Sequence, residues 1–95
     1  MKINFYATLR QITGKKTIDL PLSETITVRE LINGLVAQYP ELNNELFDDD
    51  GNLLSRVHVL INGRDALYLE DALETKVTSQ DTVNIFPAVG GGYAQ

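Results

Sequence analysis

Residues 27–36, Thr-Val-Arg-Glu-Leu-Ile-Asn-Gly-Leu-Val, carry the pattern on which the fold depends. Thr27 can cap a helix, and Glu30 at the third helical position completes a capping box. Apolar side chains then recur at helical spacing and form one stripe: Val28, Leu31, Ile32, Leu35 and Val36. Because Pro40 follows, we expect the helix to end near Tyr39. The segment predicts one amphipathic helix that packs against a sheet.

Two segments before this helix alternate apolar and polar residues, as strands with one buried face do. The first covers residues 2–9 and places Ile3, Phe5 and Ala7 on one side. The second covers residues 16–20. Residues 13–16, Thr-Gly-Lys-Lys, are a turn signal. We therefore predict an antiparallel hairpin.

Three more strands are predicted after the helix, over residues 56–61, 66–69 and 81–86, with a short helical turn around residues 42–47 between helix and strands. The Asn62-Gly63 pair is a turn signal. The order β-β-α-β-β-β, with the helix as the crossover between parallel neighbours, predicts an α+β fold of the β-grasp (ubiquitin-like) type. We expect a mixed four- to five-stranded sheet with one main helix across one face. Residues 1–87 would form this domain and residues 88–95 a flexible tail.

Composition narrows the classes of function. A chain of 95 residues holds one domain, and its net charge of −5 argues against binding to nucleic acid or to anionic membranes. It has no cysteine, which excludes disulfides, thiolate metal sites and a cysteine nucleophile. With no signal peptide and no apolar stretch long enough to span a membrane, we expect a cytoplasmic protein.

Side chains that usually perform catalysis form no recognisable constellation. His58 is the one histidine and lies within a predicted strand, where a packing or surface role is the simpler interpretation. Residues 48–50 are three consecutive aspartates, but their spacing does not fit a calcium loop, and a solvated turn is favoured. We therefore predict no catalytic residue, no metal site and no bound cofactor.

The alternation in the strands predicts a second kind of site on the face away from the helix. Tyr6, His58, Leu60 and Phe86 should share that face. Exposed apolar side chains gathered on one face are typical of a partner-binding surface, although scattered surface apolars are also common.

Glycines follow the last predicted strand, and their setting gives the sequence a family resemblance. Residues 81–92, Asp-Thr-Val-Asn-Ile-Phe-Pro-Ala-Val-Gly-Gly-Gly, resemble the C-terminus of the MoaD/ThiS family of ubiquitin-like sulfur carriers and small modifiers. Similar family motifs are present at residues 5–10, 27–31 and 59–64, so the resemblance covers nearly the whole chain in order. Without this setting, a frayed terminus would explain the glycines.

The resemblance implies a carrier protein that acts with partner enzymes, or the small subunit of a synthase complex. It also implies activation at Gly92, with Gly90 and Gly91 in the tail that reaches the partner's active site. A ubiquitin-activating-type adenylyltransferase (MoeB/ThiF-like), using its own ATP and Mg²⁺, would adenylate the glycine carboxylate. A sulfur donor would convert the adenylate to a thiocarboxylate, and a sulfur-accepting synthase would use it for a cofactor such as molybdopterin or a thiamine-like product, or for an amino acid. Glycine suits a narrow channel because it has no Cβ.

The chain departs from this pattern because Tyr93-Ala94-Gln95 follows Gly92. Cleavage between Gly92 and Tyr93 by a processing metalloprotease is the favoured explanation. An artificial extension and a loss of activation are alternatives. Two other functions also remain open: a protein modifier conjugated to lysines through Gly92, and a ubiquitin-like binding module that is not activated.

Overall fold

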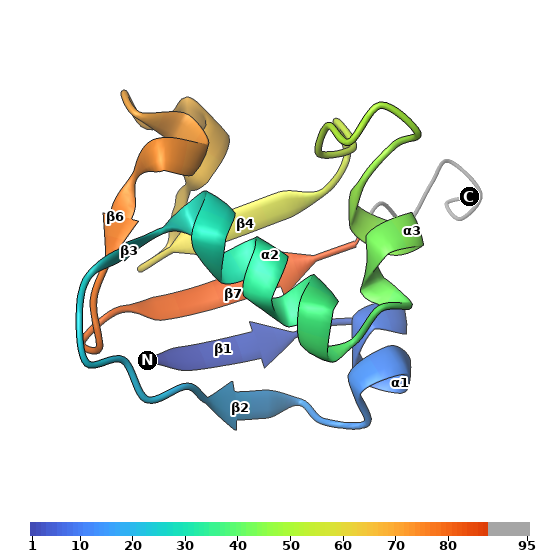
Figure 1. Cartoon of the computed structure of the whole chain (residues 1–95), viewed down its shortest axis with the longest axis horizontal. Coiled ribbons are helices and arrows are strands. Elements are labelled where there is room, and N and C mark those ends of the chain that lie inside the picture. Colours follow the sequence, from blue (N-terminus) through green and yellow to red (C-terminus); the bar gives the residue numbers. More distant parts are fainter. Residues whose placement is uncertain (88–95) are drawn as a thin grey trace.

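The structure is a computed structural model that describes residues 1–87 of the chain (Figure 1). The predicted adenylation and processing residues Gly90, Gly91, Gly92 and Tyr93 lie outside the described residues, as does the whole segment 88–95. Along the chain the elements are β1 (Lys2–Phe5), α1 (Thr8–Thr13), β2 (Thr17–Asp19), β3 (Ile26–Thr27), α2 (Val28–Gln38), α3 (Leu42–Leu46), β4 (His58–Ile61), β5 (Arg64–Asp65), the 3₁₀ helices η1 (Ala66–Tyr68) and η2 (Ala72–Glu74), β6 (Lys76–Val77) and β7 (Thr82–Phe86).

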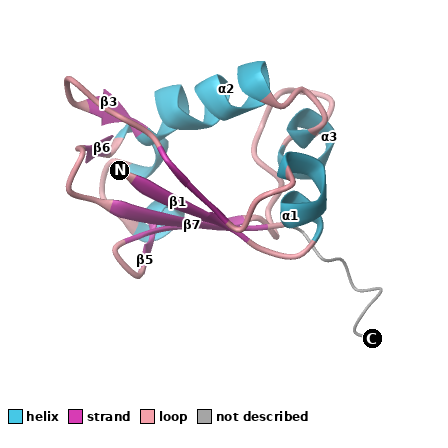
Figure 2. Cartoon of the chain, turned by 90° about the horizontal axis from the view of Figure 1, so that it is seen from below, coloured by secondary structure: helices cyan, strands magenta, loops and turns pink. Residues whose placement is uncertain are grey.

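Five strands form one mixed sheet in the order β2-β1-β7-β4-β5. The first and last long strands, β1 and β7, lie parallel at its centre, and the other neighbouring pairs are antiparallel. A parallel pair needs a crossover, which α2 supplies on one face of the sheet (Figures 1 and 2). This is the predicted β-grasp arrangement. The antiparallel pairing of β1 with β2 is confirmed, but the two strands are joined through helix α1 and not by the turn at residues 13–16 alone.

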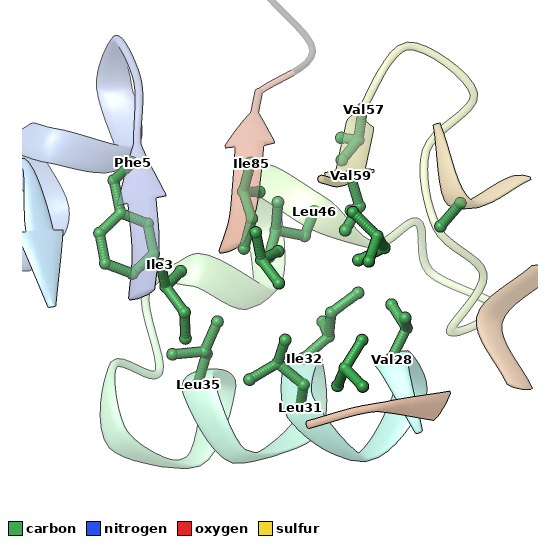
Figure 3. Close-up of a cluster of buried hydrophobic side chains, with 14 of the residues drawn as sticks. Ile3, Phe5, Val28, Leu31, Ile32, Leu35, Leu46, Val57, Val59 and Ile85 are labelled. Carbon is green, nitrogen blue, oxygen red and sulfur yellow. The ribbon is translucent and has the colours of Figure 1, made fainter. Parts of the chain in front are cut away.

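The helix α2 begins and ends as its sequence predicts. Thr27 accepts a hydrogen bond from the backbone N–H of Glu30, whose carboxylate in turn accepts from the backbone N–H of Thr27. The helix ends at Gln38, just before Tyr39 and Pro40. Its apolar stripe meets the strands in a dry core (Figure 3), in which the fully buried side chains include Ile3, Phe5, Val28, Leu31, Ile32, Leu35, Leu46, Val57, Val59 and Ile85.

The prediction of a first strand extending to Leu9 is wrong, because β1 ends at Phe5 and α1 follows. Ala7 has φ 52° and ψ −128° and sits in a tight turn in which the N–H of Leu9 donates to the carbonyl of Tyr6 at 3.1 Å. Leu9 and Thr13, four residues apart, are the buried positions of α1. Leu9 therefore fits a helical spacing as well as the strand alternation that the sequence suggested. Figure 1 shows α1 beside α3 at the end of the sheet where β1 and β7 finish.

Other boundaries differ from the predictions. The strand predicted at residues 66–69 is the 3₁₀ helix η1, because the Asp65 carboxylate accepts a hydrogen bond from the N–H of Leu67 and starts a helical turn. The strands expected at 56–61 and 81–86 begin later, at His58 and Thr82. The sequence also gave no sign of the small antiparallel sheet of β3 and β6, whose two-residue strands are too short to show periodicity. The predicted helical turn at residues 42–47 is α3.

The Asn62-Gly63 turn joins β4 to β5 as predicted, and it also holds the start of β7. Both residues have positive φ, 52° and 87°. The Asn62 amide donates to the Asp81 carboxylate at 2.8 Å and its oxygen accepts from the N–H of Thr82 at 2.9 Å. The bond from Asn62, with a second from the N–H of Thr78, lowers the pKa of Asp81 below its usual value. Within residues 1–87, no helix is both long enough and apolar enough to cross a bilayer.

Candidate functional site

The sheet face opposite α2 gathers most of the residues that the alternation pointed to. In the pairing of β4 with β7, His58 lies opposite Phe86 and Leu60 opposite Asn84. Asn84 also lies opposite Asn4 on β1. Directly paired residues project to the same side of a sheet, so these side chains share one face. We call this surface the open face and define it by Asn4, Tyr6, His58, Leu60, Asn84 and Phe86.

Tyr6 and Phe86 form an aromatic pair on the open face. Their ring centroids are 4.2 Å apart and their planes differ by 10°. The Tyr6 hydroxyl donates to Oδ1 of Asn84 at 3.0 Å, which fixes the ring from its polar end. Both aromatic residues are half-buried. The pair therefore offers a rigid apolar surface that includes Phe86, the last residue of β7, from which the chain continues through Pro87 toward the tail.

The centre of the open face is more polar than the sequence led us to expect. Oδ1 of Asn84 accepts from the amide of Asn4 at 2.8 Å as well as from Tyr6, and Oδ1 of Asn4 accepts from Thr17 at 2.7 Å. These bonds connect β2, β1 and β7 through side chains. Both asparagines lie between buried residues of their strands, so alternation alone puts them on this face but assigns them no role. Their position in mid-strand, where asparagine is disfavoured, was the available signal.

His58 has a carboxylate partner that sequence reasoning did not identify. Its Nδ1 lies 2.8 Å from Oδ2 of Asp65, while Oδ1 of Asp65 accepts from the N–H of Leu67. The His58 side chain is 51% exposed and that of Asp65 only 16%. The half-buried carboxylate therefore orients an exposed imidazole at the edge of the open face. Asp65 is the diagonal neighbour of His58 across β4 and β5, a relation that requires the strand register.

Arg10 is a further residue that the sequence analysis missed. Its Nε donates to the carbonyl of Phe5 at 2.8 Å, and its guanidinium carbon lies 5.4 Å from the centroid of the Tyr6 ring. Arg10, Tyr6 and Phe86 thus follow one another at the end of the open face nearest the tail. The alternation could not show this, because Arg10 belongs to α1 rather than to a strand.

Thr8 and the acidic turn at residues 48–50 make hydrogen bonds within the fold. Thr8, expected to point away from the helix on the first strand, is instead the first residue of α1, and its hydroxyl donates to Glu45 at 2.9 Å. The acidic turn at residues 48–50 is closed by its own backbone. Oδ1 of Asp48 accepts from the N–H groups of Asp50 and Asn52, both at 2.9 Å. Within residues 1–87, no three His, Asp or Glu side chains converge as metal ligands.

Comparison with known protein families gives a match over most of the chain. The family model described as "ThiS family" matches residues 3–92. The chain is 35% identical over 92 residues to small archaeal modifier protein 3 of Haloferax volcanii, covering 97% of this chain and 98% of that protein. It is 37% identical over 93 residues to a candidate sulfur carrier protein of Archaeoglobus fulgidus, with 97% and 98% covered.

Solved structures agree with this assignment. The crystal structure of SAMP1 from Haloferax volcanii superposes with a TM-score of 0.79 at 31% identity, covering 96% of this chain and 97% of that one. A chain of the BexX/CysO complex from Amycolatopsis orientalis superposes with a TM-score of 0.75 at 27% identity, covering 96% and 98%. Sulfur carriers and modifiers are therefore both among the proteins that this chain resembles.

Proposed function

The chain belongs to the ThiS family of ubiquitin-like proteins, and from this premise we propose that it is a sulfur carrier activated at Gly92. One observation carries the proposal: the family match extends through residue 92 and stops there, at the end of the three glycines. The similarity to the candidate sulfur carrier of Archaeoglobus fulgidus supports the carrier role.

The proposed reaction uses the Gly92 carboxylate as the nucleophile. One carboxylate oxygen attacks the α-phosphorus of ATP, so that a C–O–P linkage forms and pyrophosphate leaves. A persulfide donor then supplies sulfur to the carbonyl carbon and AMP leaves. Reduction of the resulting acyl disulfide by a thiol releases the thiocarboxylate. The adenylyltransferase provides ATP and Mg²⁺, and this chain contributes only the acyl group.

Removal of Tyr93-Ala94-Gln95 is part of the same proposal. In the full chain the carbonyl of Gly92 is tied up in a peptide bond to Tyr93, and an amide cannot be adenylated as a carboxylate is. A processing metalloprotease would hydrolyse that bond and free the Gly92 carboxylate. Within residues 1–87, His58 bonds to Asp65 but no serine or threonine hydroxyl bonds to its ring, so no nucleophile–base pair for self-cleavage is formed there.

The open face supplies the proposed docking surface. Its aromatic pair includes Phe86, which stands two residues before the tail begins at position 88. An enzyme that holds Gly92 in its active site would meet this end of the sheet first. Tyr6, His58, Leu60 and Phe86 are therefore the proposed contacts with the adenylyltransferase and, after sulfur loading, with the synthase.

A second candidate function is favoured by the relatives themselves. Small archaeal modifier protein 3 of Haloferax volcanii is 35% identical to this chain. A modifier would use the same activated Gly92 but pass its acyl group to a lysine amine, giving an isopeptide. The two functions differ in the acceptor and share the fold, the open face and the tail.

The experiment compares three forms of the chain: residues 1–95, 1–92 and 1–91. Each is incubated with the adenylyltransferase of the same cell, ATP, Mg²⁺ and a persulfide donor, and its intact mass is measured. We expect only the 1–92 form to gain AMP and then to exchange oxygen for sulfur. Equal activation of the 1–95 form would refute the processing step, and activation of none would refute the proposed function. Isopeptide-linked products in cell extracts, without a thiocarboxylate, would favour the modifier.

A further inference from the structure

Arg10 lies against the aromatic pair of the open face but is not used by the fold as an ion-pair partner. Among residues 1–87, the arginine that forms an ion pair is Arg29, with Glu74, and His58 is hydrogen-bonded to Asp65. Arg10 instead has its Nε bonded to the carbonyl of Phe5 and its guanidinium near the ring of Tyr6. The residue as a whole is exposed.

These two contacts fix the guanidinium while leaving most of its donors available. Arginine has five N–H donors, of which the Nε–H is occupied by Phe5. Within residues 1–87, the two terminal amino groups have no hydrogen-bond acceptor. A guanidinium held by its Nε and by an aromatic ring loses little conformational freedom on binding. It is therefore a preorganised fork whose terminal amino groups bond to none of residues 1–87.

The chemistry of such a fork selects a carboxylate. Planar carboxylates accept two parallel N–H bonds from arginine, and such bidentate pairs are stronger than neutral hydrogen bonds. A phosphate offers similar geometry, but the net charge of −5 opposes approach to a polyanionic nucleic acid. A single carboxylate on a protein surface avoids that repulsion and can sit next to apolar side chains that cover Tyr6 and Phe86.

We infer that Arg10 is the charged anchor of the open face and pairs with an Asp or Glu carboxylate of the adenylyltransferase, beside an apolar contact on Tyr6 and Phe86. The inference rests on the proposed function. It goes beyond it by naming a residue outside the strands and the chemistry that the partner must present. Arg10 also sits on the tail side of the face, so the pair would set the orientation in which the tail enters the enzyme.

The test measures the dissociation constant of the full chain, residues 1–95, with the adenylyltransferase of the same cell at two salt concentrations. We expect Arg10→Gln to weaken binding by about 10- to 100-fold and to reduce its salt dependence. Arg10→Lys keeps the charge without the fork and should lose an intermediate amount. Arg64→Gln is the matched control, since Arg64 is an exposed arginine on β5 near the opposite end of the sheet, and should bind like the wild type.

Circular dichroism and urea unfolding of each variant separate binding from folding. Loss of affinity in Arg10→Gln with unchanged salt dependence would show that Arg10 only supports Tyr6, and would overturn the inference. So would wild-type affinity in Arg10→Gln. Shifts of the NMR signals of residues 88–95 in the free Arg10→Gln chain would identify the tail as the occupant and overturn it too. A wild-type chain that binds the enzyme neither as residues 1–95 nor as residues 1–92 would refute the proposed function and the inference together.

Discussion

Replacement of Asn84 by alanine tests whether the polar centre of the open face holds the sheet together. Oδ1 of Asn84 accepts from both the Asn4 amide and the Tyr6 hydroxyl, so one substitution removes the acceptor of two bonds. The side chain lies at the centre of the sheet, on the strand that pairs with both β1 and β4. We expect Asn84→Ala to destabilise the fold without changing its topology.

The magnitude follows from the number and burial of these bonds. A hydrogen bond contributes about 0.5–1.5 kcal/mol net to stability. Because Asn4, Tyr6 and Asn84 are half-buried, water can replace part of what is lost, and we expect a decrease of about 1–2 kcal/mol in the free energy of unfolding. For a domain of this size, each kcal/mol corresponds to a change of about 4–8 °C in Tm.

Urea unfolding followed by circular dichroism measures the effect, with Asn44→Ala as the control. Asn44 is an exposed residue of α3, and its replacement should change stability by less than about 0.5 kcal/mol. The variant Tyr6→Phe removes one of the two bonds, and it should cost less in the Asn84→Ala background than in the wild type. If Asn84→Ala unfolds like the wild type, or if Tyr6→Phe costs the same in both backgrounds, the network does not stabilise the sheet.

Three further predictions concern binding, pH and backbone strain. Leu60→Asp should weaken binding to the adenylyltransferase by about tenfold or more with an unchanged unfolding midpoint, and unaltered affinity in a calorimetric titration would remove Leu60 from the interface. Asp81 has a lowered pKa in the fold, chiefly because Asn62 donates to it, so its stabilisation is complete above its unfolded pKa of 3.8 and is lost as pH falls through the lower folded value. Urea midpoints are measured between about pH 5 and pH 2, a range that brackets the titration of a carboxyl group. They should fall less steeply with falling pH for Asp81→Asn than for the wild type, and identical slopes would show that Asp81 does not cause the loss of stability. Ala7→Gly should raise stability by about 0.5–1 kcal/mol, because the φ of 52° strains alanine but not glycine, and a lower thermal midpoint would show that backbone entropy outweighs the strain.

The predictions were correct where the residues that determine a structural element all lie within one short segment. The capping box of Thr27 and Glu30 and the stripe behind it define α2 from residues within one helix. The strand alternation placed His58, Leu60 and Phe86 on the open face, although their role as partner contacts stays a prediction. The alternation was misleading at residues 7–9, where the apolar spacing fits a helix as well as a strand. It was misleading again at residues 66–69, where the Asp65 side chain caps a 3₁₀ helix in place of the predicted strand.

Periodicity and turn residues act over a few neighbours, so the β-grasp class, the helix that crosses the sheet and the position of the glycines after the last strand could be read from the residues alone. The residues that surround the aromatic pair are brought together only by the folded chain. Arg10 reaches Tyr6 from α1, Asn4 and Asn84 meet from strands 80 residues apart, and Asp65 finds His58 across two strands. These contacts depend on strand register and on the turn at Ala7, which arise from packing of the whole core and leave no mark in any single segment.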